Sequence, residues 1–290
     1  MTGKLALGTA QFGLDYGIAN QGGRVSLEEG RTILAEAGRS GIDTLDTAIA
    51  YGESECVLGQ IGVGGFRVVS KLPKMPDDER DVEGWVERQV TGSLSRLGIM
   101  KLYGLLLHYP AQLHEKNGRD LCLALRSAKE KGLVEKTGVS IYAPDELEEL
   151  LASCDADLVQ APLNILDQRL ISSGWLRRLQ SMGVEVHVRS IFLQGLLLMP
   201  SVQRPVKFSA WKDLWLAWDA WLAETGMSGL EACVRFALNQ PGVERVVTGV
   251  DSHAHLQQIM ALPHGSLGAV PDFAAYCDER LITPSCWNQL

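Results

Sequence analysis

The stretch 41–55, with the sequence GIDTLDTAIAYGESE, constrains the fold of this chain more than any other. Residues 42–45 are long enough only for a short apolar strand, and the acidic segment from Glu53 is typical of the start of a helix. Asp46 and Tyr51 therefore lie in the loop that follows a strand. In a barrel of alternating strands and helices, such loops converge at one rim and carry the active site.

The alternation of strand and helix continues along the chain and recurs about eight times. Such regular alternation is typical of a parallel sheet, and the count favours a closed barrel. We therefore predict an α/β fold, a (β/α)8 TIM barrel. A G-x-G-x-x-G motif does not follow the first strand, so a Rossmann fold has no support. The predicted strands are 5–8, 42–45, 66–70, 103–107, 137–140, 158–160, 184–189 and 243–248.

The length of 290 residues is ordinary for one barrel domain, which we expect to span about 5–262 within a single domain 1–290. Two segments fall outside the repeat: an extra helical segment, 196–224, after the seventh strand, and a C-terminal tail, 263–290. The first contains tryptophans at helical spacing, a pattern that predicts a packed face. Whether either segment lines the pocket stays open. These tryptophans are Trp211, Trp215, Trp218 and Trp221.

The formal net charge of -8 argues against broad binding of nucleic acid, which needs a basic face. No apolar run approaches the ~20 residues of a membrane helix. The amino terminus lacks the pattern of a signal peptide, so we expect a cytoplasmic protein. The oligomeric state stays open.

The six cysteines show no C-x-x-C pair and no histidine at ligand spacing. We therefore expect reduced thiols and no metal site. The cysteines are Cys56, Cys122, Cys154, Cys233, Cys277 and Cys286.

Two further strand ends carry residues that complete a catalytic set with Asp46 and Tyr51. Lys71 directly follows the predicted strand 66–70, and His108 directly follows 103–107. A tyrosine is a poor acid or base at neutral pH unless a cation lies beside it. Lys71 would supply that cation, and Asp46 would keep it charged. His108 would hydrogen-bond and orient a carbonyl oxygen.

In this order and local context, Asp46, Tyr51, Lys71 and His108 resemble the catalytic tetrad of the aldo-keto reductase family. The resemblance covers roughly residues 5–262. It implies an NAD(P)H-dependent oxidoreductase that interconverts an aldehyde or ketone and the corresponding alcohol, with Tyr51 as the proton donor. The implied partners are a small carbonyl substrate and NADP(H) or NAD(H), with no metal.

The resemblance extends to a cofactor groove, in which Asn164 looks like a family asparagine. This sequence departs from the family at Ile141 and Leu163, where asparagine and tyrosine are common. Arg189 stands where many members have a tyrosine that stacks on the nicotinamide ring; a guanidinium could stack there or pair with the pyrophosphate. The residues implied to bind the cofactor are Thr9, Asp46, Ser140, Gln160, Arg189, Ser190, Gln194, Gly195, Gly249, Asp251, Ser252 and Gln258.

The choice between NAD and NADP stays open, because Asp251 would repel a 2'-phosphate while the frequency in the family favours NADP(H). The aromatic residues Phe12, Tyr16 and Tyr109 are expected to wall the substrate pocket. Sugars, hydroxyaldehydes and aromatic aldehydes are all compatible with such a wall.

Two other functions are compatible with a barrel of this kind. Lys71 could form a Schiff base, as in an aldolase, although the neighbouring Asp46 would keep its amine protonated. Alternatively, the chain could be a non-catalytic nicotinamide-binding module that senses redox state. The intact set of four catalytic residue types argues against the second alternative.

Overall fold

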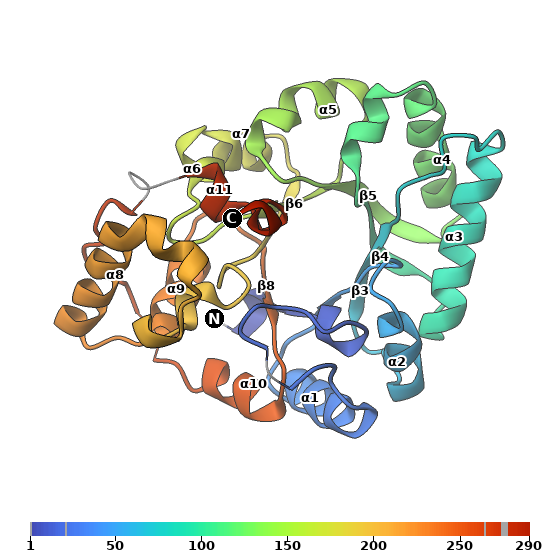
Figure 1. The fold of residues 1–290 in the computed structure, drawn as a ribbon. Helices are drawn as coiled ribbons and strands as arrows, with labels where there is room; N and C mark the ends of the chain where they lie inside the picture. Colours follow the sequence, from blue (N-terminus) through green and yellow to red (C-terminus); the bar gives the residue numbers. More distant parts are fainter. Residues whose placement is uncertain (1, 21, 264, 274–277) are drawn as a thin grey trace.

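The computed structural model describes residues 1–290 apart from residues 1, 21, 264 and 274–277. Eight parallel strands pair in sequence order, and β1 also pairs with β8, so the sheet closes into a barrel (Figure 1). The prediction of a (β/α)8 TIM barrel is confirmed. The strands are β1 Leu5–Gly8, β2 Thr44–Asp46, β3 Arg67–Leu72, β4 Leu102–Leu107, β5 Val134–Ser140, β6 Leu158–Pro162, β7 Glu185–Arg189 and β8 Arg245–Gly249.

Helices surround the barrel as an outer layer (Figure 1). The first helix begins directly after Ser26, because the Ser26 hydroxyl accepts a hydrogen bond from the Glu29 amide and so caps the helix. In the part of the chain that the structure describes, no helix combines the length and apolar character needed to cross a membrane. The helices of the repeat are α1 Leu27–Arg39, α2 Ser54–Ile61, α3 Val82–Leu97, α4 Gly118–Glu130, α5 Leu147–Ser153, α6 Arg169–Ser172, α7 Trp175–Ser181, α9 Gly229–Leu238 and α10 His253–Met260.

The hydrophobic core has two parts. The larger part fills the space between strands and helices, with residues such as Leu45 and Ile33. A smaller cluster of Val69, Leu106 and Leu158 lies apart from it. These three come from strands whose other faces contribute to the larger core, so we place the smaller cluster inside the barrel. Polar and charged side chains lie toward both ends of the same strands.

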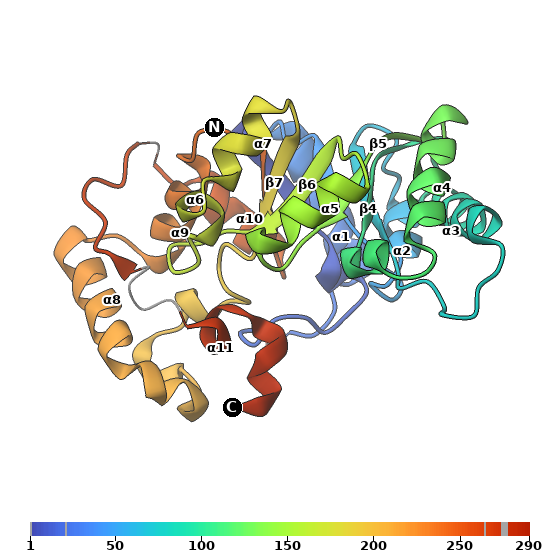
Figure 2. The ribbon, with the colours of Figure 1, turned by 90° about the horizontal axis from the view of Figure 1, so that it is seen from above.

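The segment after β7 contains the helix α8, Lys212–Thr225, outside the repeat. Trp215, Trp218 and Trp221 are buried, which confirms the predicted packed face. The Trp218 ring lies 5.6 Å from the ring of Phe273 in the C-terminal tail, so the two extra segments pack on each other. Figure 2 shows the two termini on opposite sides of the molecule.

The rest of the tail is also tied to the segment after β7. It contains the short helix α11, Glu279–Ile282. The ring of Trp287 lies 4.9 Å from that of Phe208, and Lys207 Nζ donates a hydrogen bond to the Trp287 carbonyl. The C-terminal tail therefore covers part of the segment after β7.

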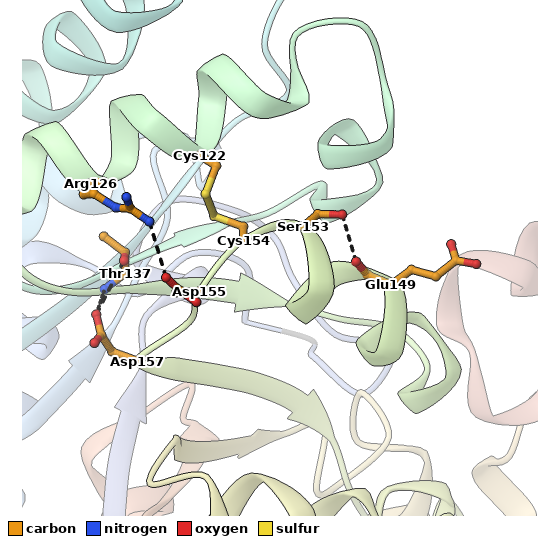
Figure 3. The surroundings of a disulfide bond; sticks show 8 residues. All are labelled: Cys122, Arg126, Thr137, Glu149, Ser153, Cys154, Asp155 and Asp157. Atoms are coloured by element: carbon orange, nitrogen blue, oxygen red, sulfur yellow. Dashed lines mark hydrogen bonds and ion pairs between the residues drawn. A yellow bond between two sulfur atoms is a disulfide. The ribbon is translucent and has the colours of Figure 1, made fainter.

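The prediction that all cysteines are reduced thiols is wrong for one pair. Cys122 in α4 and Cys154, directly after α5, form a disulfide (Figure 3). Their Cα atoms lie 5.7 Å apart, because α4 and the end of α5 are neighbours in the outer layer. Sequence spacing alone does not reveal this contact. Cys56, Cys233 and Cys286 are free thiols, and Cys277 lies outside the described residues.

Candidate active site

A buried ion pair lies at the carboxyl end of the barrel. Lys71, in β3, has no exposed surface, and its Nζ donates to Asp46 Oδ2 at 2.7 Å and Oδ1 at 2.9 Å. A third bond, at 2.8 Å, goes to the Thr47 carbonyl. Burial acts to lower the pKa of Lys71, but the Asp46 carboxylate and Tyr51 together outweigh it and the pKa is raised. Lys71 is therefore held as an ammonium ion.

Tyr51 and His108 lie beside this ion pair. Lys71 Nζ is 5.1 Å from the centroid of the Tyr51 ring. The rings of Tyr51 and His108 are 5.8 Å apart and nearly perpendicular. The structure therefore brings together all four residues of the predicted tetrad, which come from β2, β3 and the loops after β2 and β4.

Two glycines allow the loop of Tyr51 to approach the loop after β1. A Cβ atom on Gly13 would lie 1.8 Å from the Tyr51 carbonyl oxygen, so only glycine permits this contact. Gly52 has a φ of +56°, a left-handed conformation that side chains disfavour, and a Cβ there would meet the Gly13 carbonyl at 2.6 Å. The backbone on both sides of Tyr51 is thus positioned by close packing.

His108 is a neutral imidazole in this site. Burial, Lys71 and Arg189 lower its pKa to about 4. Its Nδ1 atom is buried and has no hydrogen-bond partner among the described residues. A neutral imidazole carries one N–H donor, which is what hydrogen bonding to a carbonyl oxygen requires.

Ser140, at the end of β5, and Gln160, in the middle of β6, extend the polar network. Gln160 Nε2 donates to Asp46 Oδ1 at 2.6 Å. Ser140 Oγ lies 3.3 Å from Gln160 Oε1, and both side chains are buried. The predicted cofactor residues Ser140 and Gln160 are therefore connected through hydrogen bonds to the predicted catalytic pair.

Arg189, at the end of β7, reaches across the end of β6 to the loop that follows β5. Its Nη2 donates to the Ile141 carbonyl at 2.9 Å, and its guanidinium lies 5.0 Å from the centroid of the Tyr142 ring. Nη1 donates to Ser190 Oγ at 3.2 Å. Sequence reasoning did not select Tyr142. Its position just past the end of a strand, two residues after Ser140, is the signal that could have found it.

The loop after Arg189 has unusual backbone geometry. Ser190, Leu193 and Gln194 have φ values of 61°, 48° and 53°, and Gly195 has a φ of 90°. Asn164 Nδ2 supports the loop by donating to the Ser190 carbonyl at 3.1 Å. Residues other than glycine rarely adopt this conformation, and those that do cluster at functional sites, so the loop is a candidate binding segment.

The remaining predicted cofactor residues lie near β1 and β8. Thr9 is buried and its hydroxyl donates to the Asp46 carbonyl at 2.9 Å, so Thr9 positions β2. Ser252 Oγ accepts the His255 amide and thereby caps α10. Gln258 is exposed on the same helix. Gly249 ends β8, and a Cβ atom there would lie 2.7 Å from the Gln11 side chain.

Acidic side chains surround the start of α10. Burial raises the pKa of Asp251, against the opposing effect of His255. Glu29 Oε1 accepts a hydrogen bond from the His253 amide at 2.6 Å. The helix amides that could hold a phosphate are therefore partly occupied by a carboxylate of this chain.

The three predicted wall residues differ in position. The Tyr109 ring lies 5.5 Å from the His108 ring, and 47% of Tyr109 is exposed. Tyr16 is 39% exposed, and its pKa is raised by partial burial and by the neighbouring Tyr51. Phe12 is only 2% exposed and belongs to the hydrophobic core, which argues against its predicted contact with substrate.

Within the described parts of the chain, no group of three His, Cys, Asp or Glu side chains is arranged to hold a metal ion.

Comparison with known proteins agrees with this fold. The model of the Aldo/keto reductase family matches residues 4–267. Among solved structures, the holo form of an aldo-keto reductase from Bacillus halodurans is 19% identical with a TM-score of 0.72, covering 94% of this chain and 90% of that one. A Pseudomonas aeruginosa protein classed as an aldo-keto reductase is 22% identical with a TM-score of 0.65 over the same shares. No match was found among curated proteins.

Proposed function

The chain belongs to the aldo/keto reductase family, and on this premise we propose that it reduces an aldehyde or ketone to an alcohol, or catalyses the reverse oxidation, with a nicotinamide cofactor. The observation that carries the proposal is the cluster of Tyr51 and His108 around the buried pair of Lys71 and Asp46. A phenol, an ammonium and a neutral imidazole at one point suit acid catalysis on a carbonyl oxygen.

In this proposal Tyr51 donates its hydroxyl proton to the carbonyl oxygen of the substrate. The Lys71 ammonium lies beside the Tyr51 ring and stabilises the negative charge that the phenol gains when its proton leaves. Asp46 and the Thr47 carbonyl keep that ammonium in place. His108 donates its N–H to the same carbonyl oxygen and orients it.

The residues around the tetrad fit a nicotinamide cofactor. The Ser140 hydroxyl and the Gln160 amide offer the donors and acceptors that a carboxamide group needs. The left-handed loop 190–195 offers backbone amides for phosphate oxygens. When bound, the cofactor supplies or accepts the hydride.

We further propose a preference for NAD(H) over NADP(H). Asp251 and Glu29 place carboxylates at the start of α10, where the resemblance puts the adenosine ribose. Carboxylates accept hydrogen bonds from ribose hydroxyls but repel a 2'-phosphate.

Titration of both reduced cofactors by quenching of tryptophan fluorescence tests this preference. Tighter binding of NADH is expected. Asp251→Ser, which keeps the helix cap at Ser252, should improve NADPH binding and weaken NADH binding, because it removes both the repulsion of a 2'-phosphate and a charged acceptor for the ribose hydroxyls. Tighter binding of NADPH by the unmodified protein would contradict the proposal.

The raised pKa of Lys71 argues against the Schiff-base alternative, because a protonated amine cannot attack a carbonyl. Borohydride treatment in the presence of an aldehyde should therefore leave Lys71 unmodified, as read by mass spectrometry. A covalent adduct on Lys71 would favour an aldolase instead.

A panel of aldehydes, ketones and alcohols assayed with both nicotinamide cofactors tests the proposed activity directly. We expect turnover of at least one carbonyl compound, followed by the change in nicotinamide absorbance. Cofactor binding without turnover of any compound would favour the redox-sensing alternative.

The cytoplasmic location expected from the sequence stays a prediction. The disulfide between Cys122 and Cys154 is typical of oxidising compartments. Cell fractionation, with trapping of free thiols before lysis, would establish both the location and the oxidation state of the pair.

A further inference from the structure

Ser70 lies directly before Lys71 in β3 and takes no part in the proposed proton transfer. Side chains alternate between the two faces of a strand, so Lys71 points into the barrel and Ser70 points outward, toward the helices. Ser70 is fully buried, and its hydroxyl donates to Glu55 Oε1 in α2 at 2.6 Å. A short, charge-assisted hydrogen bond therefore joins the strand that carries Lys71 to the helix that follows Tyr51.

Glu55 is fixed from several sides. It is 2% exposed, and Ser93 Oγ in α3 donates to the same Oε1 atom, also at 2.6 Å. Arg96, in the same helix, places Nε 2.8 Å and Nη2 2.7 Å from Oε2. The two helices also approach closely, because a Cβ atom on Gly59 would lie 1.9 Å from the Arg96 carbonyl oxygen. Glu55 is thus a rigid anchor between β3, α2 and α3.

The start of α2 also contacts both members of the catalytic pair. The Ser54 amide donates to the Tyr51 carbonyl at 3.1 Å. The Ser54 hydroxyl lies 3.1 Å from that of Thr47, and the Thr47 carbonyl accepts a hydrogen bond from Lys71 Nζ. A displacement of β3 relative to α2 would therefore change the position of Lys71 relative to Tyr51.

We propose that Ser70 is a positioning residue for the proposed reaction. Through its bond to Glu55, it fixes the distance between the Lys71 ammonium and the Tyr51 phenol. Lys71 Nζ is 5.1 Å from the centroid of the Tyr51 ring, and its attraction for a developing phenolate depends on that distance. Ser93 donates to the same oxygen but lies in α3, so only Ser70 links this anchor to Lys71 through its own strand. The inference rests on the proposed reductase function.

Two alanine variants test the inference, because each removes a hydroxyl donor from the same atom, Glu55 Oε1. Ser70→Ala and Ser93→Ala should lower the Tm by similar amounts. Only Ser70→Ala should lower kcat, by about 10-fold, since a misplacement of about 1 Å costs about 10²-fold and a smaller displacement is expected here. KM and cofactor affinity should change little in either variant. Equal kcat values for the two variants would show that Ser70 serves stability alone, and would overturn the inference.

The dependence of kcat/KM on pH separates positioning from a general loosening of the fold. Carbonyl reduction needs the protonated phenol, so the rate falls on the alkaline side as Tyr51 loses its proton. A more distant ammonium stabilises the phenolate less, so this fall should move to higher pH in Ser70→Ala. It should stay at the wild-type pH in Ser93→Ala. A lower rate in Ser70→Ala with an unmoved pH profile would contradict the proposed role.

The variant Glu55→Asp tests whether Ser70 acts through Glu55. It keeps the charge but shortens the side chain by one methylene, which withdraws the carboxylate from the Ser70 hydroxyl. We expect a loss of kcat similar to that of Ser70→Ala, and no further loss when the two substitutions are combined, because they break one contact. Additive losses would mean that Ser70 acts by another route and would overturn the inference.

Failure of the proposed function has a separate signature. If no carbonyl compound is turned over with either nicotinamide cofactor, the reductase activity is wrong, but crystal structures of the wild type and the two alanine variants still test the positioning. The distance from Lys71 Nζ to the Tyr51 ring centroid should be longer in Ser70→Ala and unchanged in Ser93→Ala. The same distance in all three proteins would overturn the role of Ser70.

Discussion

Both ends of the barrel carry titratable side chains, but the two ends differ in whether each charged side chain has a charged partner. At the amino end, Glu185 accepts hydrogen bonds from Tyr103 at 2.7 Å and from Lys136, and lies 2.7 Å from His187 Nε2. At the carboxyl end, Lys71 and Asp46 are paired, whereas the hydrogen bonds of Arg189 to the described residues go to neutral acceptors. A paired charge contributes to stability, whereas a charge without a partner can bind a ligand.

The pairing at the amino end continues on its outer side. Arg245 donates to Thr44 and forms an ion pair with Asp43. His187 Nδ1 and His108 Nδ1 both lack hydrogen-bond partners in the described structure, so the contrast lies in the charges and not in every polar atom. It agrees with the general division of such barrels into a catalytic face and a stabilising face.

The largest expected effect is the loss of activity in Tyr51→Phe. Removal of the proton donor should lower kcat by about 10²- to 10⁴-fold, the usual contribution of general acid catalysis. The Tm and cofactor affinity should stay nearly unchanged. Steady-state kinetics and fluorescence titration measure these quantities.

The matched control is Tyr103→Phe at the amino end. It removes the bond to Glu185 and should lower the free energy of unfolding while kcat stays at the wild-type value. If Tyr51→Phe kept most of its activity, Tyr51 would not be the proton donor. A large loss of kcat in Tyr103→Phe would erase the contrast between the two ends.

The next effect is on stability. Glu185→Gln leaves Lys136 without its carboxylate, and breaking a buried pair costs about 3 to 5 kcal/mol. The lower value is expected, because the Lys136 side chain is 28% exposed. Urea unfolding measures the loss, and kcat of the folded protein should be unchanged. A fully stable variant would show that the amino-end network does not support the barrel.

A somewhat smaller effect is expected from the outer layer of helices, which belongs to neither end. The double variant Cys122→Ser with Cys154→Ser should lose about 2 to 4 kcal/mol, because the unfolded chain is no longer constrained by the cross-link. Activity should be retained. Cys56→Ser, which removes a free thiol, is the control. Equal stability with and without a reductant would mean that the bond does not form in solution.

The most gradual effect is the dependence of stability on pH, which should fall in a different range for each end. The pKa of His108 is lowered from 6.5 to about 4, so the unfolded state binds a proton first and stability falls from about pH 6.5 to about pH 4. Burial alone would raise the pKa of Glu185, but hydrogen bonds from His187, Lys136 and Tyr103 lower it from 4.5 to about 2. Its contribution is therefore lost from about pH 4.5 to about pH 2.

Each loss is at most about 1.4 kcal/mol per pH unit for one proton. The free energy of unfolding measured between pH 7 and pH 3 should show both ranges. His108→Gln should remove the loss between pH 6.5 and 4.5, and Glu185→Gln the loss below 4.5. Identical pH profiles for the two variants would contradict the separation of the two ends.

Much of the site could be predicted because its key residues follow local patterns. Asp46, Lys71 and His108 each lie at or just past the end of an apolar run, and such runs form strands whatever they later pair with. The exact ends were less predictable: the second strand was expected at 42–45 and is Thr44–Asp46. Strand ends depend on which neighbours complete the hydrogen-bond ladder.

The sequence by itself determined the alternation of strands and helices and the residue types at the carboxyl end, because both depend on neighbours in the chain. Closure of the barrel decided which residues far apart in the chain came into contact. It brought Arg189 to the Ile141 carbonyl over 48 residues and Tyr103 to Glu185 over 82 residues, and helix packing joined Cys122 to Cys154. Such pairs have no sequence signal, because their distance depends on how the whole sheet closes.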